Sequence, residues 1–288
     1  MTAEEATALA AAQAVAREHR VACDEAVLIA AGSNVLVHLK PAPVVARVMT
    51  GTAVLHDDPE RWLTREVAVG TFLADLVVAP TDLLPPGPHE RDGLWMTLWQ
   101  FVALDEHAPP PEPRELGRSL RDLHEALAGF PAALAPLSEI RDWLEGLRAE
   151  LRPSPAVTAE DIAWLGLELE ALTPAVFESA LPAQALHGDA SVSNLLRTER
   201  GLVWNDLEDV CAGPVAWDVA GLVTSASARG LSAGELLAAY GDPGVESLVP
   251  FLDAHALYDV VWQAYEARRR PHAIERAAAS LALLRRER

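Results

Sequence analysis

Apolar positions recur in two different patterns along this chain. Up to about residue 102, short β-branched runs separated by turn-forming residues predict an antiparallel meander, with one amphipathic helix before it and another within it. Proline and glycine between positions 80 and 93 predict a loop. The predicted strands cover 26–30, 35–39, 44–48 and 94–102, and the predicted helices cover 2–18 and 59–76.

From residue 114 onward the apolar positions have helical spacing almost throughout. The proline-rich run 109–113 predicts a stiff linker before this region, and short apolar runs between turns interrupt the helices at 184–206. The predicted helices cover 114–128, 137–151, 158–179, 215–227, 231–240, 246–269 and 271–287. We therefore predict an α+β fold of two lobes, a small antiparallel β-sheet N-lobe at 1–103 and a larger, mostly helical C-lobe at 104–288.

Composition and charge narrow the classes of partner. The chain has 288 residues, half of them hydrophobic, which is enough for a sizeable core. Its net charge of −19 argues against nucleic acid and favours a cationic ligand, although solubility explains the charge equally well.

No apolar run is long enough to cross a membrane, and the N-terminus is acidic where a secretory signal would be basic. Cys23 and Cys211 lack metal-ligand spacing, so we expect free thiols in a cytoplasmic protein.

The segment His187-Gly188-Asp189, followed after four residues by Asn194, is the strongest candidate for chemistry. Seventeen positions after Asp189, Asp206 ends a short apolar run. Phosphoryl transfer requires a carboxylate that accepts the hydroxyl proton, and oxygen ligands that hold Mg²⁺ against the nucleotide phosphates. The spacing His-x-Asp-x4-Asn matches a kinase catalytic loop. The alternative is a pair of turns at Asp189 and Asn194 without chemistry.

With these residues the chain resembles the aminoglycoside phosphotransferase and choline kinase-like family, which has the bilobal protein-kinase-like fold. The resemblance implies that Asp189 is the catalytic base and that Asn194 and Asp206 are ligands of Mg²⁺, with ATP or GTP as the phosphoryl donor. It extends to the segment 213–220, where Asp218 would sit on a helix and hold the backbone of the catalytic loop.

In the N-lobe the resemblance assigns residues to the nucleotide. Gly32-Ser33-Asn34 would form a short loop facing the phosphates, although such a sequence taken alone is more often an ordinary hairpin turn. Arg47 would bind the α- and β-phosphates, and Glu66 on the following helix would pair with it. Without the resemblance, both charged residues would be interpreted as parts of solvated faces.

The resemblance also covers the nucleotide base and the catalytic loop. The segment 96–102 is similar to the strand beside the base, so the backbone of Gln100 and Val102 would meet the base edge. Ser193 stands where many relatives have glycine, which implies a stiffer loop. His124 is expected to be a packed helix residue rather than a catalytic one.

The acceptor would be a small molecule with a hydroxyl group. Asp259, Trp262 and Glu266 share one helix face. This acidic and aromatic face suits a cationic amino sugar or a choline-like ammonium, the latter through cation–π contact. An ordinary amphipathic helix with that tryptophan in the core is an equal alternative. The candidate lining residues are Glu208, Asp209, Asp259, Trp262 and Glu266.

The sequence thus predicts a small-molecule kinase, a phosphotransferase that moves the γ-phosphoryl group of ATP or GTP onto a hydroxyl. An aminoglycoside or another amino sugar or amino alcohol is a candidate acceptor, and neither nucleic acid nor a membrane is an expected partner. One alternative is a catalytically inactive kinase-like protein that binds a nucleotide or metabolite, against which the complete set of Asp189, Asn194 and Asp206 argues. The other is a helical interaction protein that binds no nucleotide.

Overall fold

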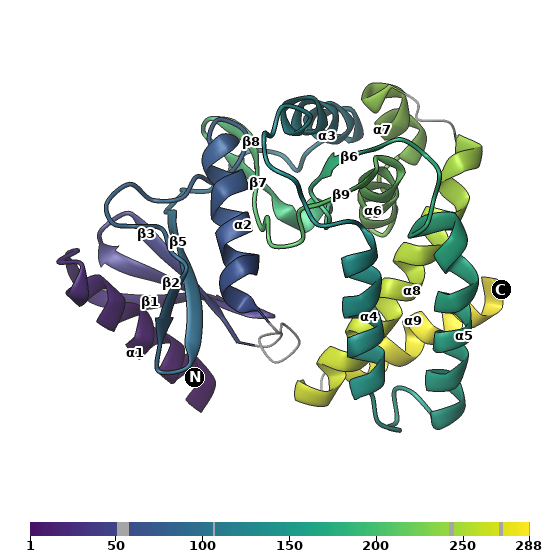
Figure 1. Cartoon of the computed structure of the whole chain (residues 1–288), viewed down its shortest axis with the longest axis horizontal. Helices are drawn as coiled ribbons and strands as arrows, with labels where there is room; N and C mark the ends of the chain where they lie inside the picture. Colours follow the sequence, from purple (N-terminus) through teal and green to yellow (C-terminus); the bar gives the residue numbers. More distant parts are fainter. Residues whose placement is uncertain (51–57, 106, 242–244, 271–272, 288) are drawn as a thin grey trace. The chain divides into compact units, whose positions relative to one another are not determined.

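The computed structural model describes residues 1–50, 58–105, 107–241, 245–270 and 273–287 (Figure 1). The chain forms two compact units, of which the first contains Met1–Pro110 and Asn194–Val210 and the second contains Pro111–Ser193 and Cys211–Arg288. The segment 194–210 belongs to the first unit by its contacts, and the predicted domain boundary after residue 103 stays a prediction. An antiparallel sheet in the first unit and helices in the second confirm the predicted α+β class.

A five-stranded antiparallel sheet in the order β1-β2-β3-β5-β4 forms the centre of the first unit (Figure 1). The predicted meander is confirmed, and the third strand pairs with the fifth as a direct neighbour. The prediction of an unbroken loop over 80–93 is wrong, because the short edge strand β4 forms within it and pairs with β5. The strands are β1 (Cys23–Ala31), β2 (Asn34–Pro41), β3 (Val44–Met49), β4 (His89–Arg91) and β5 (Leu94–Gln100).

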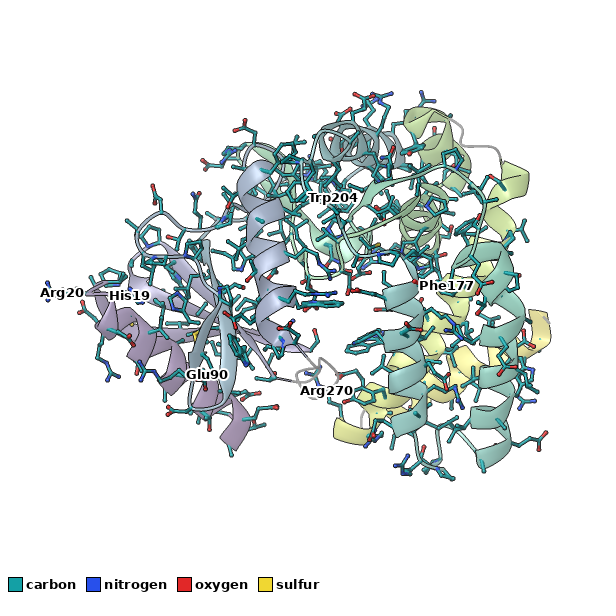
Figure 2. The ribbon with its side chains drawn as sticks, in the orientation of Figure 1. His19, Arg20, Glu90, Phe177, Trp204 and Arg270 are labelled. Carbon is teal, nitrogen blue, oxygen red and sulfur yellow. The ribbon has the colours of Figure 1, made fainter. Side chains whose placement is uncertain are left out.

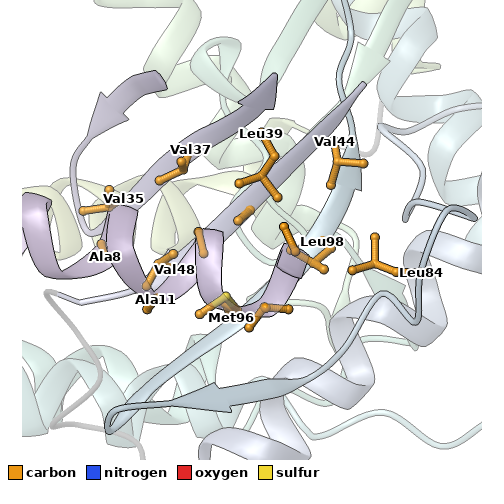
Figure 3. Close-up of a cluster of buried hydrophobic side chains, with 14 of the residues drawn as sticks. Ala8, Ala11, Val35, Val37, Leu39, Val44, Val48, Leu84, Met96 and Leu98 are labelled. Carbon is orange, nitrogen blue, oxygen red and sulfur yellow. The ribbon is translucent and has the colours of Figure 1, made fainter. Parts of the chain in front are cut away.

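The two faces of this sheet have different compositions, because successive side chains along a strand point to opposite sides. One face is apolar and packs against helix α1 (Ala3–Glu18), which begins with the capping box of Thr2 and Glu5 (Figure 3). The buried side chains of this layer include Ala8, Ala11, Ala12, Val15, Val35, Val37, Leu39, Val44, Ala46, Val48, Met96 and Leu98. The alternate positions of the same strands point to the other face, and they include Arg47, Thr97 and Trp99.

Helix α2 (Pro59–Phe72) and the hairpin of β7 (Leu195–Thr198) and β8 (Gly201–Trp204) complete the first unit. Asp58 caps the helix by accepting a hydrogen bond from the amide of Arg61. The hairpin is tied to residues 76–78, since the amide of Trp204 donates to the carbonyl of Leu76 and its carbonyl accepts from the amide of Val78. The Trp204 side chain is fully buried in this unit (Figure 2).

The second unit is helical apart from one pair of short strands, β6 (Ala183–Leu186) and β9 (Cys211–Pro214). The predicted helices are confirmed with small shifts at their ends, except that residues 271–272 of the predicted helix 271–287 lie outside the described residues. Strand β9 was not predicted. A 3₁₀ turn, Val192–Asn194, follows the segment 187–189 and ends at the first residue of the segment 194–210. The helices are α3 (Pro113–Leu127), α4 (Ser138–Glu150), α5 (Ala159–Val176), α6 (Ala216–Ser227), α7 (Ala233–Tyr240), α8 (Val245–Arg269) and α9 (Ile274–Glu287).

Two further expectations concern the cysteines and the membrane. Cys23 and Cys211 form no disulfide, as predicted. Across the described part of the chain, none of the helices combines the length and the apolar character needed to span a bilayer.

Candidate active site

A cavity of roughly 540 Å³ opens on the face of the sheet opposite α1, entirely within the first unit. Its walls combine apolar side chains with one buried arginine, which is the composition expected of a pocket for a planar base joined to an anionic group. Six of the predicted nucleotide-binding residues line it: Gly32, Ser33, Asn34, Arg47, Gln100 and Val102. The predicted metal ligand Asp206 lines it as well.

Among the described residues that line this cavity, Arg47 is the only one with a cationic side chain, and it is 6% exposed. Its guanidinium lies 3.2 Å from a carboxylate oxygen of Glu66 and 3.0 Å from Oδ1 of Asp206. It also forms an ion pair with Glu208. The pairing of Arg47 with Glu66 that the resemblance implies is therefore present, and two more carboxylates share the same guanidinium.

This cluster has one cation and three carboxylates, so a formal charge of −2 remains when all are ionised. Burial raises the pKa of the Glu66 carboxyl to about 7, with Arg47 opposing the rise and Glu208 adding to it. Burial likewise raises the pKa of Asp206 to about 6, again opposed by Arg47 and reinforced by Glu208. Burial disfavours the charged guanidinium of Arg47, but the three carboxylates outweigh it and raise its pKa. The site therefore favours additional positive charge.

Asp206 and Asn194 lie on segments that hydrogen bonding joins. The amide of Asn205 donates to the carbonyl of Asn194 at 2.8 Å, which ties the residue before Asp206 to the end of the 3₁₀ turn. Asp206 itself has a φ of +64°, a left-handed backbone conformation that is uncommon for a residue with a side chain and is often found at functional sites. Glu208, which also pairs with Arg47, contacts a second side chain, because Nδ2 of Asn34 lies 3.4 Å from both of its carboxylate oxygens.

The oxygen donors of Asp206 and Asn194 suit a hard divalent cation. The negative charge left around Arg47 fits such an ion, so the residues present agree with the Mg²⁺ that the resemblance implies. Within the described ranges, no three histidine, cysteine, aspartate or glutamate side chains gather in a metal-binding cluster. A metal ion here would thus depend on phosphate oxygens for further ligands, as Mg²⁺ commonly does.

In the second unit, the backbone of the candidate catalytic loop is fixed by Asp218. Its carboxylate accepts hydrogen bonds from the amides of His187 at 2.7 Å and Gly188 at 2.9 Å. Trp217 adds a third bond, because its indole Nε1 donates to the carbonyl of Gly188 at 2.6 Å. Gly188 has a φ of +88°, which only glycine adopts without strain. The predicted role of Asp218 is therefore confirmed: it holds the loop from helix α6.

His124 forms two side-chain contacts that the sequence did not predict. Its Nε2 lies 2.8 Å from Asp218 and its Nδ1 lies 2.9 Å from the hydroxyl of Tyr240. Asp218 is fully buried, and burial alone would raise its pKa, but hydrogen bonding from His124 and the loop amides lowers it instead. The prediction that His124 is a packed helix residue is confirmed. No local pattern indicated that its side chain bonds to Asp218, the residue that also binds the candidate catalytic loop.

The predicted base Asp189 follows this fixed backbone in the second unit and is partly exposed. Its amide lies 3.3 Å from Nδ1 of His187. Beyond it the loop is stabilised by side chains, since the hydroxyls of Ser191 and Ser193 are 2.7 Å apart and Ser225 accepts from the amide of Val192. These bonds agree with the stiffer loop that serine at position 193 implied.

Among the candidate acceptor residues, Trp262 belongs to an aromatic stack rather than to the core. Its ring centroid lies 5.8 Å from that of Trp143, and Trp143 in turn stacks on Tyr258 at 5.6 Å. Glu266 is 8% exposed and forms an ion pair with Arg270 at 3.4 Å, whereas Asp259 is exposed. The predicted helix face therefore contains both aromatic rings and carboxylates.

Known structures share this fold. The chain superimposes on APH(2")-IIia, determined as a complex with GDP and kanamycin, with a TM-score of 0.69 and 14% identity over 97% of this chain and 99% of that one. The amicoumacin kinase hAmiN, in complex with AMP-PNP, Ca²⁺ and Ami, gives 0.68 and 12% over 99% and 95%. A microcompartment-associated aminopropanol kinase gives 0.64 and 19% over 95% and 97%. The predicted kinase-like fold is therefore confirmed.

Sequence comparison gives the family. Among proteins of curated function, none matches this chain in sequence. The model of the phosphotransferase enzyme family matches residues 32–251, a range that contains most of the cavity residues, Arg47 and Asp206 among them, and the loop held by Asp218. Since that match covers most of its length, the chain belongs to the phosphotransferase enzyme family.

Proposed function

We propose that this chain transfers the γ-phosphoryl group of ATP or GTP to a hydroxyl of a small molecule. The observation that carries the proposal is Arg47, a buried cation in the wall of an apolar cavity, beside carboxylates that exceed it in charge. A nucleotide base suits the apolar walls, and Arg47 suits its phosphates. The GDP and AMP-PNP in the similar structures support a nucleotide as the ligand.

The residues have distinct roles in this proposal. Gly32, Ser33 and Asn34 face the phosphates with their backbone, and Gln100 and Val102 meet the base edge. Glu66 holds Arg47 in place. Asn194 and Asp206 hold Mg²⁺, which when bound supplies charge neutralisation to the phosphate groups.

Asp189 is the proposed base in the second unit. Its carboxylate would accept the proton of the acceptor hydroxyl and align the attacking oxygen, which forms a bond to the γ-phosphorus while the bond from that phosphorus to the leaving nucleoside diphosphate breaks. Support comes from the backbone around it, because Asp218 and Trp217 fix the two preceding residues. A base held this way needs little reorganisation before the reaction.

The acceptor class we infer is an amino sugar or amino alcohol. The stack of Trp143, Tyr258 and Trp262 offers ring faces to an ammonium group, and the carboxylate of Glu266 lies on the same helix as two of these rings. The net charge of −19 attracts a cation over long range. The kanamycin complex and the aminopropanol kinase among the similar structures support this class of acceptor.

The decisive experiment measures the melting temperature with and without Mg²⁺ across ATP, GTP and a panel of amino sugars and amino alcohols, followed by turnover of the best pair. A ligand that binds only the folded state raises the melting temperature. Asp189→Asn should lower turnover by at least about a hundredfold with nucleotide affinity unchanged, and Asp206→Ala should weaken the Mg²⁺-dependent shift. A nucleotide shift without turnover of any acceptor would instead favour the inactive, nucleotide-binding alternative.

A further inference from the structure

Behind the cavity, a chain of buried hydrogen bonds runs from its apolar wall to Arg47. The indole Nε1 of Trp99 donates to Oγ1 of Thr97 at 2.8 Å. The hydroxyl of Thr97 donates to Oε2 of Glu66 at 3.2 Å, and the same carboxylate pairs with Arg47. All four residues belong to the first unit, and none is more than 7% exposed.

The direction of these bonds follows from the chemistry of the groups. An indole N–H can only donate, so it occupies a lone pair of the Thr97 oxygen. The single hydroxyl proton of Thr97 is thereby left for Glu66, whose ionised carboxylate, the form that pairs with Arg47, can only accept. The pairing of β3 with β5 places Thr97 directly opposite Arg47. Both side chains therefore donate a hydrogen bond to the same oxygen of Glu66, Oε2.

Trp99 is fixed by its own surroundings. A Cβ atom on Gly70 of helix α2 would lie 2.7 Å from Cζ3 and 2.9 Å from Cη2 of the indole, so the ring fills the space that this glycine leaves open. The same indole is part of the cavity wall. One side chain is therefore both the surface against which a base would lie and the first donor in the chain of bonds.

We propose that Thr97 and Trp99 are positioning residues, which hold Glu66 and through it Arg47 in the orientation that binds the phosphates. This inference rests on the proposed function. Trp99 orients the hydroxyl of Thr97, this hydroxyl orients the Glu66 carboxylate, and the carboxylate fixes the guanidinium. The base end and the phosphate end of the cavity are thus connected through the sheet and helix α2, and neither Thr97 nor Glu66 needs to touch the nucleotide.

The test compares binding of Mg²⁺-ATP and Mg²⁺-GTP with binding of the bare nucleosides adenosine and guanosine, by calorimetry. Thr97→Val removes the hydroxyl and keeps the shape. It should weaken the better triphosphate by about tenfold, the size expected for losing a hydrogen bond to a charged group, and leave the nucleoside within about twofold. Thr97→Ser should restore triphosphate affinity. Thr71→Val, which removes an exposed threonine hydroxyl from α2, is the matched control and should leave both affinities unchanged.

The outcomes separate the two proposals. The positioning role alone would be overturned if the wild type binds these nucleotides and Thr97→Val either keeps its triphosphate affinity or loses triphosphate and nucleoside affinity equally. A wild type that binds none of these nucleotides would overturn the proposed function and this inference with it. If Thr97→Val does not fold, Trp99→Phe decides: it removes the first donor and part of the wall, so triphosphate affinity should fall several-fold more than nucleoside affinity, and equal losses would overturn the positioning role.

Discussion

Asp206 in the first unit and Asp218 in the second are both aspartates beside candidate catalytic segments, yet their surroundings differ. Asp218 is fully buried and accepts bonds from two backbone amides and His124, which lower its pKa. Asp206 shares one guanidinium with two other carboxylates, and its pKa is raised to about 6.

The difference distinguishes a structural carboxylate from one suited to bind a ligand. Asp218 accepts three hydrogen bonds from the protein, so its charge is stabilised by the fold itself, and these bonds fix the loop. The cluster around Arg47 has too few donors for its carboxylates, so a bound cation would relieve it. Buried polar groups generally find partners within the fold, so a cluster left short of positive charge is suited to an added cation.

The largest effect we expect concerns Asp218. Asp218→Ala would leave the two loop amides and His124 without their acceptor in a dry interior, and it should lower the free energy of unfolding by about 3–5 kcal/mol. Urea denaturation measures this. Asp142→Ala removes an exposed carboxylate paired with Arg141 in the same unit, and it should cost less than about 1 kcal/mol. Equal losses for the two variants would show that burial of Asp218 is not what makes it structural.

A smaller effect should appear in the dependence of stability on pH. Burial lowers the pKa of His255 from 6.5 to about 4, and the imidazole is hydrogen-bonded to the Trp217 carbonyl. Between these two values the unfolded chain binds a proton that the folded chain does not, so stability falls as the pH drops from 6.5 to 4, by up to about 3 kcal/mol. His255→Gln should remove this contribution. Parallel pH profiles of wild type and variant would contradict it.

Glu66 should change the stability in the opposite sense over an overlapping pH range. Its pKa is raised from 4.5 to about 7, so the folded chain binds the extra proton and stability falls as the pH rises between these values. Glu66→Gln is the matched comparison for His255→Gln, because the difference between each variant and wild type should change with pH in opposite directions.

The smallest effect should come from the cluster that has excess carboxylates. Glu208→Gln leaves Arg47 paired with Glu66 and Asp206, so the free energy of unfolding without metal should change by less than about 1 kcal/mol. The stabilisation of the protein by Mg²⁺ alone should decrease, because one negative charge is gone. A loss as large as that of Asp218→Ala would mean that Glu208, too, is a structural carboxylate.

Local patterns predicted most elements of this fold. The strands at 35–39 and 44–48 and all the helices from 114 onward follow from apolar spacing, because such spacing reports which face is buried. The edge strand His89–Arg91 was missed, since three polar residues between prolines and a glycine have no strand pattern and are ordered by pairing with β5. Strand β9 was also missed, because it is ordered by pairing with β6, which is not its neighbour in sequence.

The candidate site was predictable only where its residues form a motif. The spacing of Asp189 and Asn194 is a local signal, and the resemblance supplied Arg47 and Glu66. Nothing in the sequence indicated that Thr97 reaches Glu66, or that His124 reaches Asp218, because each bond joins residues brought together by strand register or helix packing. A buried threonine or histidine at a regular apolar position is the only sign available, and it does not specify the partner.

The division of the chain between the two units has a consequence for its synthesis. Strand β8 supplies the partners of residues 76 and 78, but it is made only after residues 111–193, which belong to the other unit. Domains generally fold as units while the chain emerges from the N-terminus onward. The sheet of the first unit can therefore assemble early on the ribosome. The hairpin of β7 and β8, which Asp206 follows, joins it only once most of the chain has been translated.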